Sequence, residues 1–156
     1  MHAQADRAPQ GDAPRFRRVL VKLSGEAMAG GTATTAGRGI RGEHLARTAR
    51  EIAKAADAGA QLVIIPGGGN ILRGAELASH GLVHRDAADQ MGMLGTVINA
   101  IALREALHRE GRQAEVFSAL PVPPIAPALE RTAAIAALER GSAVIAAAGV
   151  GHPYFS

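Results

Sequence analysis

The chain has 156 residues, of which 47% are apolar and 20% charged, a balance typical of one globular domain with a sizeable core. It contains no cysteine and no apolar run near the roughly 18 residues that span a membrane, so a disulfide scaffold and a transmembrane protein are disfavoured. The formal net charge of +3 is spread along the chain, and four aromatic residues are too few for a nucleic-acid stacking surface. We expect a cytoplasmic domain that binds neither nucleic acid nor membranes.

The first part of the chain predicts a tail, a strand and a long connection. Residues 1–15 have no apolar centre and are expected to form a disordered tail, which leaves a single domain over residues 16–156. Residues 19–23 form a β-branched and leucine run closed by a Ser-Gly pair, as at the end of a buried strand. The Gly- and Thr-rich residues 26–42 have no period and predict a loop or a hairpin.

Two helices and a second strand follow. Apolar residues on one helical face precede Gly59, which is placed as a C-terminal stop. The stretch QLVIIPGGG, residues 61–69, is almost continuously apolar before its glycines, as in a strand covered on both faces. A long helix is then predicted, with Asp86 or Asp89 near its start and Gly111 at its end.

The last part of the chain completes an alternating pattern. Residues 114–120 predict a third strand, the proline-rich residues 121–128 a loop, residues 129–141 a helix and residues 142–149 a fourth strand. The order β-α-β-α-β-α-β predicts an α/β fold, in which a mainly parallel sheet lies between helices in a three-layer sandwich. Ligands of such folds bind beyond the carboxyl ends of the strands.

Glycines and one lysine gather at those predicted strand ends. Several segments lie at the carboxyl ends of predicted strands, so a parallel sheet brings them to one edge: residues 22–25, 67–70, 118 and 149–153. Glycine amides without Cβ obstruction, together with a helix N-terminus, can bind phosphate oxygens. Lys22 is one of only two lysines beside fifteen arginines, and a compact ammonium suits a moving phosphoryl charge. The pattern favours a phosphate site for phosphoryl transfer.

Each of these features also has a purely structural interpretation. The glycine triplet, residues 67–69, taken alone is more often a turn or a close backbone approach. Lys22 could reach water from a strand end, and Asp86 or Asp89 could serve only to cap the long helix. Their shared position at one edge of the predicted sheet favours the functional interpretation over the structural one.

Other patterns carry less information. His80 and His84 have no third ligand nearby, so we expect solvated surface and no metal site. Met91 and Met93 are expected in the core. Neither the G-x-x-x-x-G-K-[ST] loop nor the G-x-G-x-x-G spacing of the two commonest nucleotide-binding folds is present.

Five motifs resemble, in order and spacing, the bacterial uridylate kinases of the amino-acid-kinase superfamily: VKLSGEAM, GGGNILRGAELA, DQMGMLGTVINAIALREALHREG, AEVFSAL and AAAGVGHPYFS. The resemblance implies transfer of the ATP γ-phosphoryl group to UMP, giving UDP for pyrimidine nucleotide biosynthesis, with Mg²⁺ bound to the phosphates. It also implies a cytoplasmic homo-oligomer, a hexamer, with GTP as an allosteric effector.

The resemblance assigns roles to particular residues. Lys22 would be catalytic and balance the transition-state charge. The ATP-binding set would be Lys22, Leu23, Ser24, Gly25, Gly69 and Arg73. The UMP-binding set would be Gly68, Asp89, Val150, Gly151, His152, Pro153, Tyr154, Phe155 and Ser156.

The sequence departs from the family in two ways. The last motif usually reads Gly-Thr-Gly-Asn-Pro-Phe-Phe-Thr, so Val150 removes a hydroxyl and His152 replaces an amide, which leaves base recognition open. The family also continues for about half as much chain again, so residues 16–156 would be the phosphoryl-acceptor lobe, with the C-terminal lobe missing. A nucleotide- or anion-binding lobe without catalysis, or a regulatory partner, and a kinase of the same fold with another acceptor therefore remain as alternatives.

Overall fold

A computed structural model describes residues 16–30, 38–79, 81 and 83–155, so the predicted tail, residues 1–15, lies outside the described residues. Four strands form one parallel sheet in the order β1-β2-β4-β3. The strands are β1 Arg18–Leu23, β2 Gln61–Pro66, β3 Ala114–Ser118 and β4 Ala143–Ala147. The helices are α1 Glu26–Ala29, α2 Gly42–Asp57, α3 Gly74–Ser79, α4 Arg85–Arg109 and α5 Arg131–Glu139.

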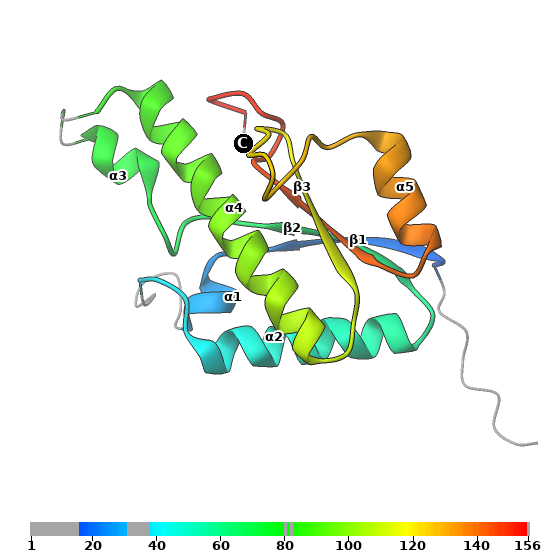
Figure 1. Cartoon of the computed structure of the whole chain (residues 1–156). Helices are drawn as coiled ribbons and strands as arrows, with labels where there is room; N and C mark the ends of the chain where they lie inside the picture. Colours follow the sequence, from blue (N-terminus) through cyan, green and yellow to red (C-terminus); the bar gives the residue numbers. More distant parts are fainter. Residues whose placement is uncertain (1–15, 31–37, 80, 82, 156) are drawn as a thin grey trace, which may run out of the picture.

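The sheet lies between two helical layers, as predicted. Helices α2 and α4 cover one face and α5 covers part of the other (Figure 1). The parallel register pairs Val21 with Ile64, and the side chains of the two residues therefore point to the same face of the sheet. The carboxyl ends of the strands, α3 and the start of α4 lie together at one side of the molecule, the left in Figure 1.

The larger part of the core fills the space between the sheet and α4. Ile64 and Ile145 from the sheet and Leu103 and Leu107 from α4 are fully buried there. A smaller cluster lies under α5 and contains Phe117, Ala137, Leu138 and Val144. Burial of these side chains on both faces explains why the strands read as apolar runs.

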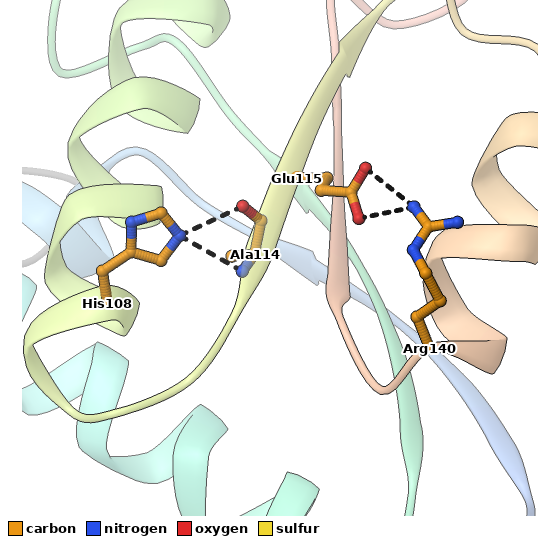
Figure 2. Close-up of polar contacts among 4 residues, drawn as sticks. All are labelled: His108, Ala114, Glu115 and Arg140. Carbon is orange, nitrogen blue, oxygen red and sulfur yellow. Dashed lines mark hydrogen bonds and ion pairs between the residues drawn. The ribbon is translucent and has the colours of Figure 1, made fainter.

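Contacts at the amino ends of the strands fasten the helices to the sheet (Figure 2). The Nε2 atom of His108, in the last turn of α4, lies 3.3 Å from both the backbone nitrogen and the backbone oxygen of Ala114. Arg140 follows α5, and its Nη2 lies 3.0 Å from Oε1 of Glu115 on β3. Both contacts are remote from the carboxyl ends of the strands, so they support the scaffold rather than the site.

The boundaries of the long elements agree with the predicted ones. Gly59 and Gly111 follow α2 and α4 with φ of 93° and 74°, the left-handed conformation that ends helices and suits glycine. One predicted loop is wrong in part, because residues 26–29 form α1; residues 31–37 of that loop lie outside the described residues. A single helical turn gives no periodic signal in a Gly-rich sequence.

The prediction for the two methionines of α4 is half right. Met93 is buried in the core, whereas Met91 is 42% exposed. With Leu94 and Ile98, which are 47% and 48% exposed, Met91 forms an outward stripe at helical spacing. The buried face of α4 carries many small residues, which let the helix approach the sheet closely.

The β1 edge of the sheet is exposed. Among the described strands β1 pairs only with β2, and Leu20 on β1 is 62% exposed. Helix α5 packs over β4 and β2, with Phe117 of β3 in the same cluster, and leaves the β1 side of that face uncovered. No helix in the described ranges is long and apolar enough to cross a membrane.

Candidate functional site

A cavity of about 520 Å³ lies at the carboxyl ends of the strands. Lys22 from β1 lines it together with the segment after β2, here called the glycine loop (Gly67, Gly68, Gly69 and Asn70), of which the three glycines contribute. Among its other lining residues, α4 and the segment after β4 contribute Asp89, Gly92, Met93, Thr96, Gly149, Val150 and Phe155. Lys22 and the glycines, 45 positions apart in sequence at the closest, are thus brought to one cavity by the parallel sheet.

Two of the three glycines are required by packing inside the protein. A Cβ on Gly68 would lie 2.5 Å from the backbone oxygen of Gly92 and 3.0 Å from the backbone nitrogen of Thr96, both on α4. A Cβ on Gly67 would lie 3.0 Å from the backbone nitrogen of Gly25. For these two positions the close-approach interpretation is therefore correct.

Gly69 differs from its neighbours. A Cβ there would meet no atom within 4 Å, and the φ of Gly69 lies outside the left-handed region. Neither packing nor backbone conformation requires a glycine at this exposed position on the cavity wall. A ligand that approaches the backbone closely would supply the missing reason.

The amides of this loop are available for a ligand. Within the ranges that the structure describes, the N–H groups of Gly68 and Gly69 donate no hydrogen bond to the protein. Lys22 is exposed and forms no ion pair with a described residue. Two unpaired amides and one ammonium on a shared wall are suited to phosphate oxygens.

Asp89 on α4 is engaged with the segment after β4. Its Oδ2 accepts a hydrogen bond of 2.9 Å from the backbone N–H of Tyr154, and its Oδ1 accepts one of 2.9 Å from Nε of Arg85. The Arg85 guanidinium lies 5.9 Å from the centroid of the Tyr154 ring. The hydrogen bond from Tyr154, followed by that from Arg85, lowers the pKa of the Asp89 carboxyl.

The capping role considered for Asp86 and Asp89 is not seen. Helix α4 begins after His84, and no side chain makes a cap hydrogen bond there. Asp86 lies in the first turn, where its charge suits the helix dipole. Asp89 lies one turn further and makes the contacts to Tyr154 and Arg85 instead.

The segment after β4 is only partly directed to the cavity. Val150 and Phe155 line it and are 61% and 77% exposed. Gly151, with φ of 83°, packs against Ala119 instead, where a Cβ would lie 3.2 Å from the backbone oxygen. His152, Pro153 and Tyr154 are not among the lining residues, and Ser156 lies outside the described residues.

The remaining predicted residues lie beside the cavity. Leu23 and Ser24 line a second cavity, of about 700 Å³, between β1 and α2. Arg73 forms an ion pair of 3.4 Å with Glu26, whose pKa is lowered chiefly by a hydrogen bond to its own backbone and then by Ser24. Gly25 is buried against Asn70.

The strand-end Ser118 and the two histidines do not extend the site. Ser118 is fully buried, and its hydroxyl has no hydrogen-bond partner among the described residues. His84 is exposed, as expected, and His80 lies outside the described residues. The described part of the chain contains no group of three or more His, Cys, Asp or Glu that could hold a metal ion.

Sequence reasoning missed Thr96 and Asn99, and it placed Asn70 at the sheet edge without identifying its contacts. The Oγ1 atom of Thr96 accepts a hydrogen bond of 2.7 Å from the backbone N–H of Ala148, which ties the end of β4 to α4. Asn70 and Asn99 are buried polar side chains at 2% and 0% exposure. The available signal was the polar residues Thr96 and Asn99 among the apolar and small residues of a long buried helix.

Comparison with known proteins agrees with this architecture. The model of the family described as "Amino acid kinase family" matches residues 17–153, so the chain belongs to the amino acid kinase family. The chain is 46% identical over 143 residues to the uridylate kinase of Methylococcus capsulatus and 45% identical over 142 residues to that of Paramagnetospirillum magneticum. These alignments cover 92% and 91% of this chain but 58% and 57% of the relatives.

Solved structures show the same similarity. The chain superposes on UMP kinase from Bacillus anthracis with a TM-score of 0.80 and 35% identity, covering 88% of this chain and 55% of that one. For UMP kinase from Ureaplasma parvum the TM-score is also 0.80, with 30% identity and coverages of 92% and 59%. The chain therefore spans somewhat more than half the length of the proteins that it resembles.

Proposed function

We propose that this chain forms the phosphoryl-acceptor lobe of a uridylate kinase, which transfers the γ-phosphoryl group of ATP to UMP and releases UDP for pyrimidine nucleotide biosynthesis. One observation carries the proposal: Lys22 and the unpaired amides of Gly68 and Gly69 line the same cavity. The similarity to uridylate kinases at 43–46% identity supports the choice of reaction.

The proposed chemistry needs positioning and charge more than a protein nucleophile. Phosphoryl transfer passes through a loose transition state whose charge is spread over the phosphoryl oxygens. Lys22, the proposed catalytic residue, would neutralise part of that charge, and the glycine amides would hold the phosphates in line. Following the resemblance, we assign Mg²⁺ to the phosphates of ATP, where it would neutralise phosphate charge when bound.

The two nucleotides would occupy opposite sides of this centre. We assign ATP phosphates to Lys22, Gly69 and the nearby Leu23, Ser24, Gly25 and Arg73. We assign UMP to Gly68, Asp89 and residues 150–156. Because Asp89 already accepts two protein hydrogen bonds, a ribose hydroxyl would use a remaining lone pair of its carboxylate or displace Tyr154.

The segment after β4 would determine which nucleotide base the site accepts. Val150 on the cavity wall offers no hydroxyl, and by the resemblance His152 replaces the amide that is usual in the family. A buried uracil edge left without partners costs about 1 to 3 kcal/mol for each lost contact. This makes a kinase of the same fold with another acceptor the second candidate, and a panel of nucleoside monophosphates and small carboxylates tests it.

A third candidate is a lobe that binds a nucleotide or anion, or acts as a regulatory partner, without catalysis. Binding of UMP or UTP without turnover, unaffected by Lys22→Ala, would support it.

Assembly is also a proposal. The exposed stripe of Met91, Leu94 and Ile98 on α4 supports a homo-oligomer, because neighbouring apolar side chains at helical spacing suit a helix-to-helix contact. The hexamer, control by GTP and a cytoplasmic location rest on the resemblance to bacterial uridylate kinases.

The decisive experiment measures UDP formation from ATP and UMP. The chain is assayed alone and joined to the part of the Methylococcus uridylate kinase that follows the matched region. We expect the joined protein to form UDP. Lys22→Ala should lower the rate by at least about a hundredfold, because it removes a contact to the transition-state charge. Lys54→Ala should leave the rate unchanged. Lys54 is the matched control because it is the only other lysine and pairs with Glu51 on the exposed surface of α2.

A further inference from the structure

The glycine loop is held by a pair of buried amides. The Nδ2 atom of Asn99 donates to Oδ1 of Asn70 at 2.6 Å, and Nδ2 of Asn70 lies 3.2 Å from Oδ1 of Asn99. Each Nδ2 makes one further bond to a backbone oxygen, Asn99 to Gly67 at 2.7 Å and Asn70 to Gly39 at 2.8 Å. All four N–H groups of the two side-chain amides are therefore used inside the protein.

This network fixes which way each amide faces. The backbone oxygens of Gly67 and Gly39 accept hydrogen bonds but cannot donate them, so only the nitrogen of each side-chain amide can lie against them. The backbone adds a second link, because the N–H of Gly39 donates to the backbone oxygen of Asn70 at 2.8 Å. Asn70 thus joins the residues that precede α2 to the glycine loop, and Asn99 joins the loop to α4.

The direction of one loop amide follows from peptide geometry. In a trans peptide the C=O of one residue and the N–H of the next point in opposite directions. Asn99 holds the C=O of Gly67, so the N–H of Gly68 must point away from Asn99. The C=O of Gly68 accepts hydrogen bonds from the N–H groups of Ile71 and Leu72 at 2.9 and 3.1 Å, which fixes the N–H of Gly69 in the same manner.

We propose that Asn99 and Asn70 are positioning residues that aim the amides of the glycine loop at a phosphate group. Neither residue lines the cavity, so neither acts by contact with the ligand: Asn99 acts through Gly67, and Asn70 holds Asn99 and Gly39. The inference rests on the proposed function for the identity of the ligand. The geometry does not depend on the proposed function: the buried amide of Asn99 on α4 holds the glycine loop, and that loop forms part of the cavity wall.

The chemistry of the pair argues against a purely space-filling role. Two buried apolar side chains would pack α4 against the loop without the desolvation that polar groups require. Asn supplies donors and an acceptor together on a short side chain, which is what a reciprocal pair with two outward bonds needs. Such a pair specifies one orientation of the Gly67 peptide, which apolar packing does not.

The test compares Asn99→Leu with Leu103→Val. Leu103 is fully buried, lies one helical turn further along α4 and does not contact the loop by hydrogen bonds, so its variant controls for lost stability alone. Urea unfolding measures the stability of both variants, and Asn99→Ser is used as well in case Asn99→Leu does not fold. Calorimetry with inorganic pyrophosphate and with UMP measures binding, and hydrogen exchange at Gly39 and Ile71 measures loop order.

We expect Asn99→Leu to weaken pyrophosphate binding by about tenfold or more, as for one lost or misaligned charge-assisted hydrogen bond. Exchange at Gly39 and Ile71 should rise well beyond the change in global stability, while Leu103→Val leaves both unchanged. Equal losses in the two variants would overturn the inference. If the unaltered chain binds neither probe, the proposed function fails, and the exchange comparison still decides whether Asn99 orders the loop.

Discussion

The Oδ2 atom of Asp89, one turn into α4, accepts a hydrogen bond of 2.9 Å from the backbone N–H of Tyr154, 65 positions further along the chain. This bond fastens the segment after β4 to the start of α4. Tyr154 has φ of 68°, a left-handed conformation that is uncommon outside glycine and needs such support. The Asp89 carboxylate is therefore one of the contacts that hold the proposed UMP-binding segment against α4.

That dependence predicts a response to acid. The contact lowers the Asp89 pKa below its ordinary value of 3.8, so its stabilising effect is present above 3.8 and is lost as the pH falls through the lowered value. Tyr154 is the only tyrosine, and the chain has no tryptophan, so intrinsic fluorescence reports this segment directly. We expect a constant signal from neutral pH to 3.8 and a change below it.

Two variants separate this contact from general acid unfolding. Asp89→Ala should show the altered fluorescence already at neutral pH, whereas Asp86→Ala, in the exposed first turn of the same helix, should behave as the unaltered chain. A neutral-pH signal unchanged by Asp89→Ala would show that the bond does not hold Tyr154.

Gly68 and Gly69 offer a matched pair of substitutions. Gly68→Ala places a methyl group 2.5 Å from the backbone oxygen of Gly92, and overpacking of this kind costs about 1 to 3 kcal/mol or more. Gly69→Ala meets nothing and should change stability by less than about 0.5 kcal/mol. It should nevertheless weaken pyrophosphate binding by about tenfold, the effect of one impaired charge-assisted contact. Urea unfolding and calorimetry measure the two effects, and full binding by Gly69→Ala would remove the argument for a ligand there.

Thr96 should matter to the junction between β4 and the segment that follows. Thr96→Val removes the acceptor of the Ala148 N–H and keeps the shape of the side chain, which should cost about 1 to 3 kcal/mol in the free energy of unfolding. Thr96→Ser retains the hydroxyl and should cost less. Chemical denaturation of both variants tests this, and an equal loss in the two would assign the effect to the missing methyl group.

The outward stripe on α4 predicts where copies of the chain associate. The double substitution Leu94→Glu with Ile98→Glu places charge on two half-exposed positions and should lower the molecular mass measured by sedimentation without unfolding the chain. Leu20→Lys, on the exposed edge strand β1, is the comparison and should leave the mass unchanged. The opposite result would place association at the sheet edge.

Much of the fold was predictable because each strand is a compact apolar run bounded by Gly, Pro or Ser. The meeting of Lys22 with the glycine loop followed from the parallel topology alone, before any distance was known. The order of the strands in the sheet could not be predicted, because an apolar run does not indicate which other strand it pairs with. Which side of α4 is exposed could not be predicted either, because Met91 and Met93 are both apolar and the buried face of the helix carries small residues.

The polar contacts of the site were the least predictable part. Asn70 and Asn99 are 29 positions apart, and nothing in either local sequence identifies the other as its partner. The same holds for Asp89 and Tyr154. Short-range patterns specify elements, whereas these bonds depend on how the completed sheet places α4 against two loops.

The position of β4 between β2 and β3 has a consequence for the nascent chain. Strands β1 and β2 can form their ladder once residue 66 has been synthesised, but β3 has no neighbour in the described sheet until residues 143–147 arrive. Before β4 is synthesised, Val116 and Phe117 lack the β4 residues with which they pair in the sheet. Pairing of β4 with both β2 and β3 then joins the two parts of the sheet, so residues 143–147 complete the ladder for strands on both sides.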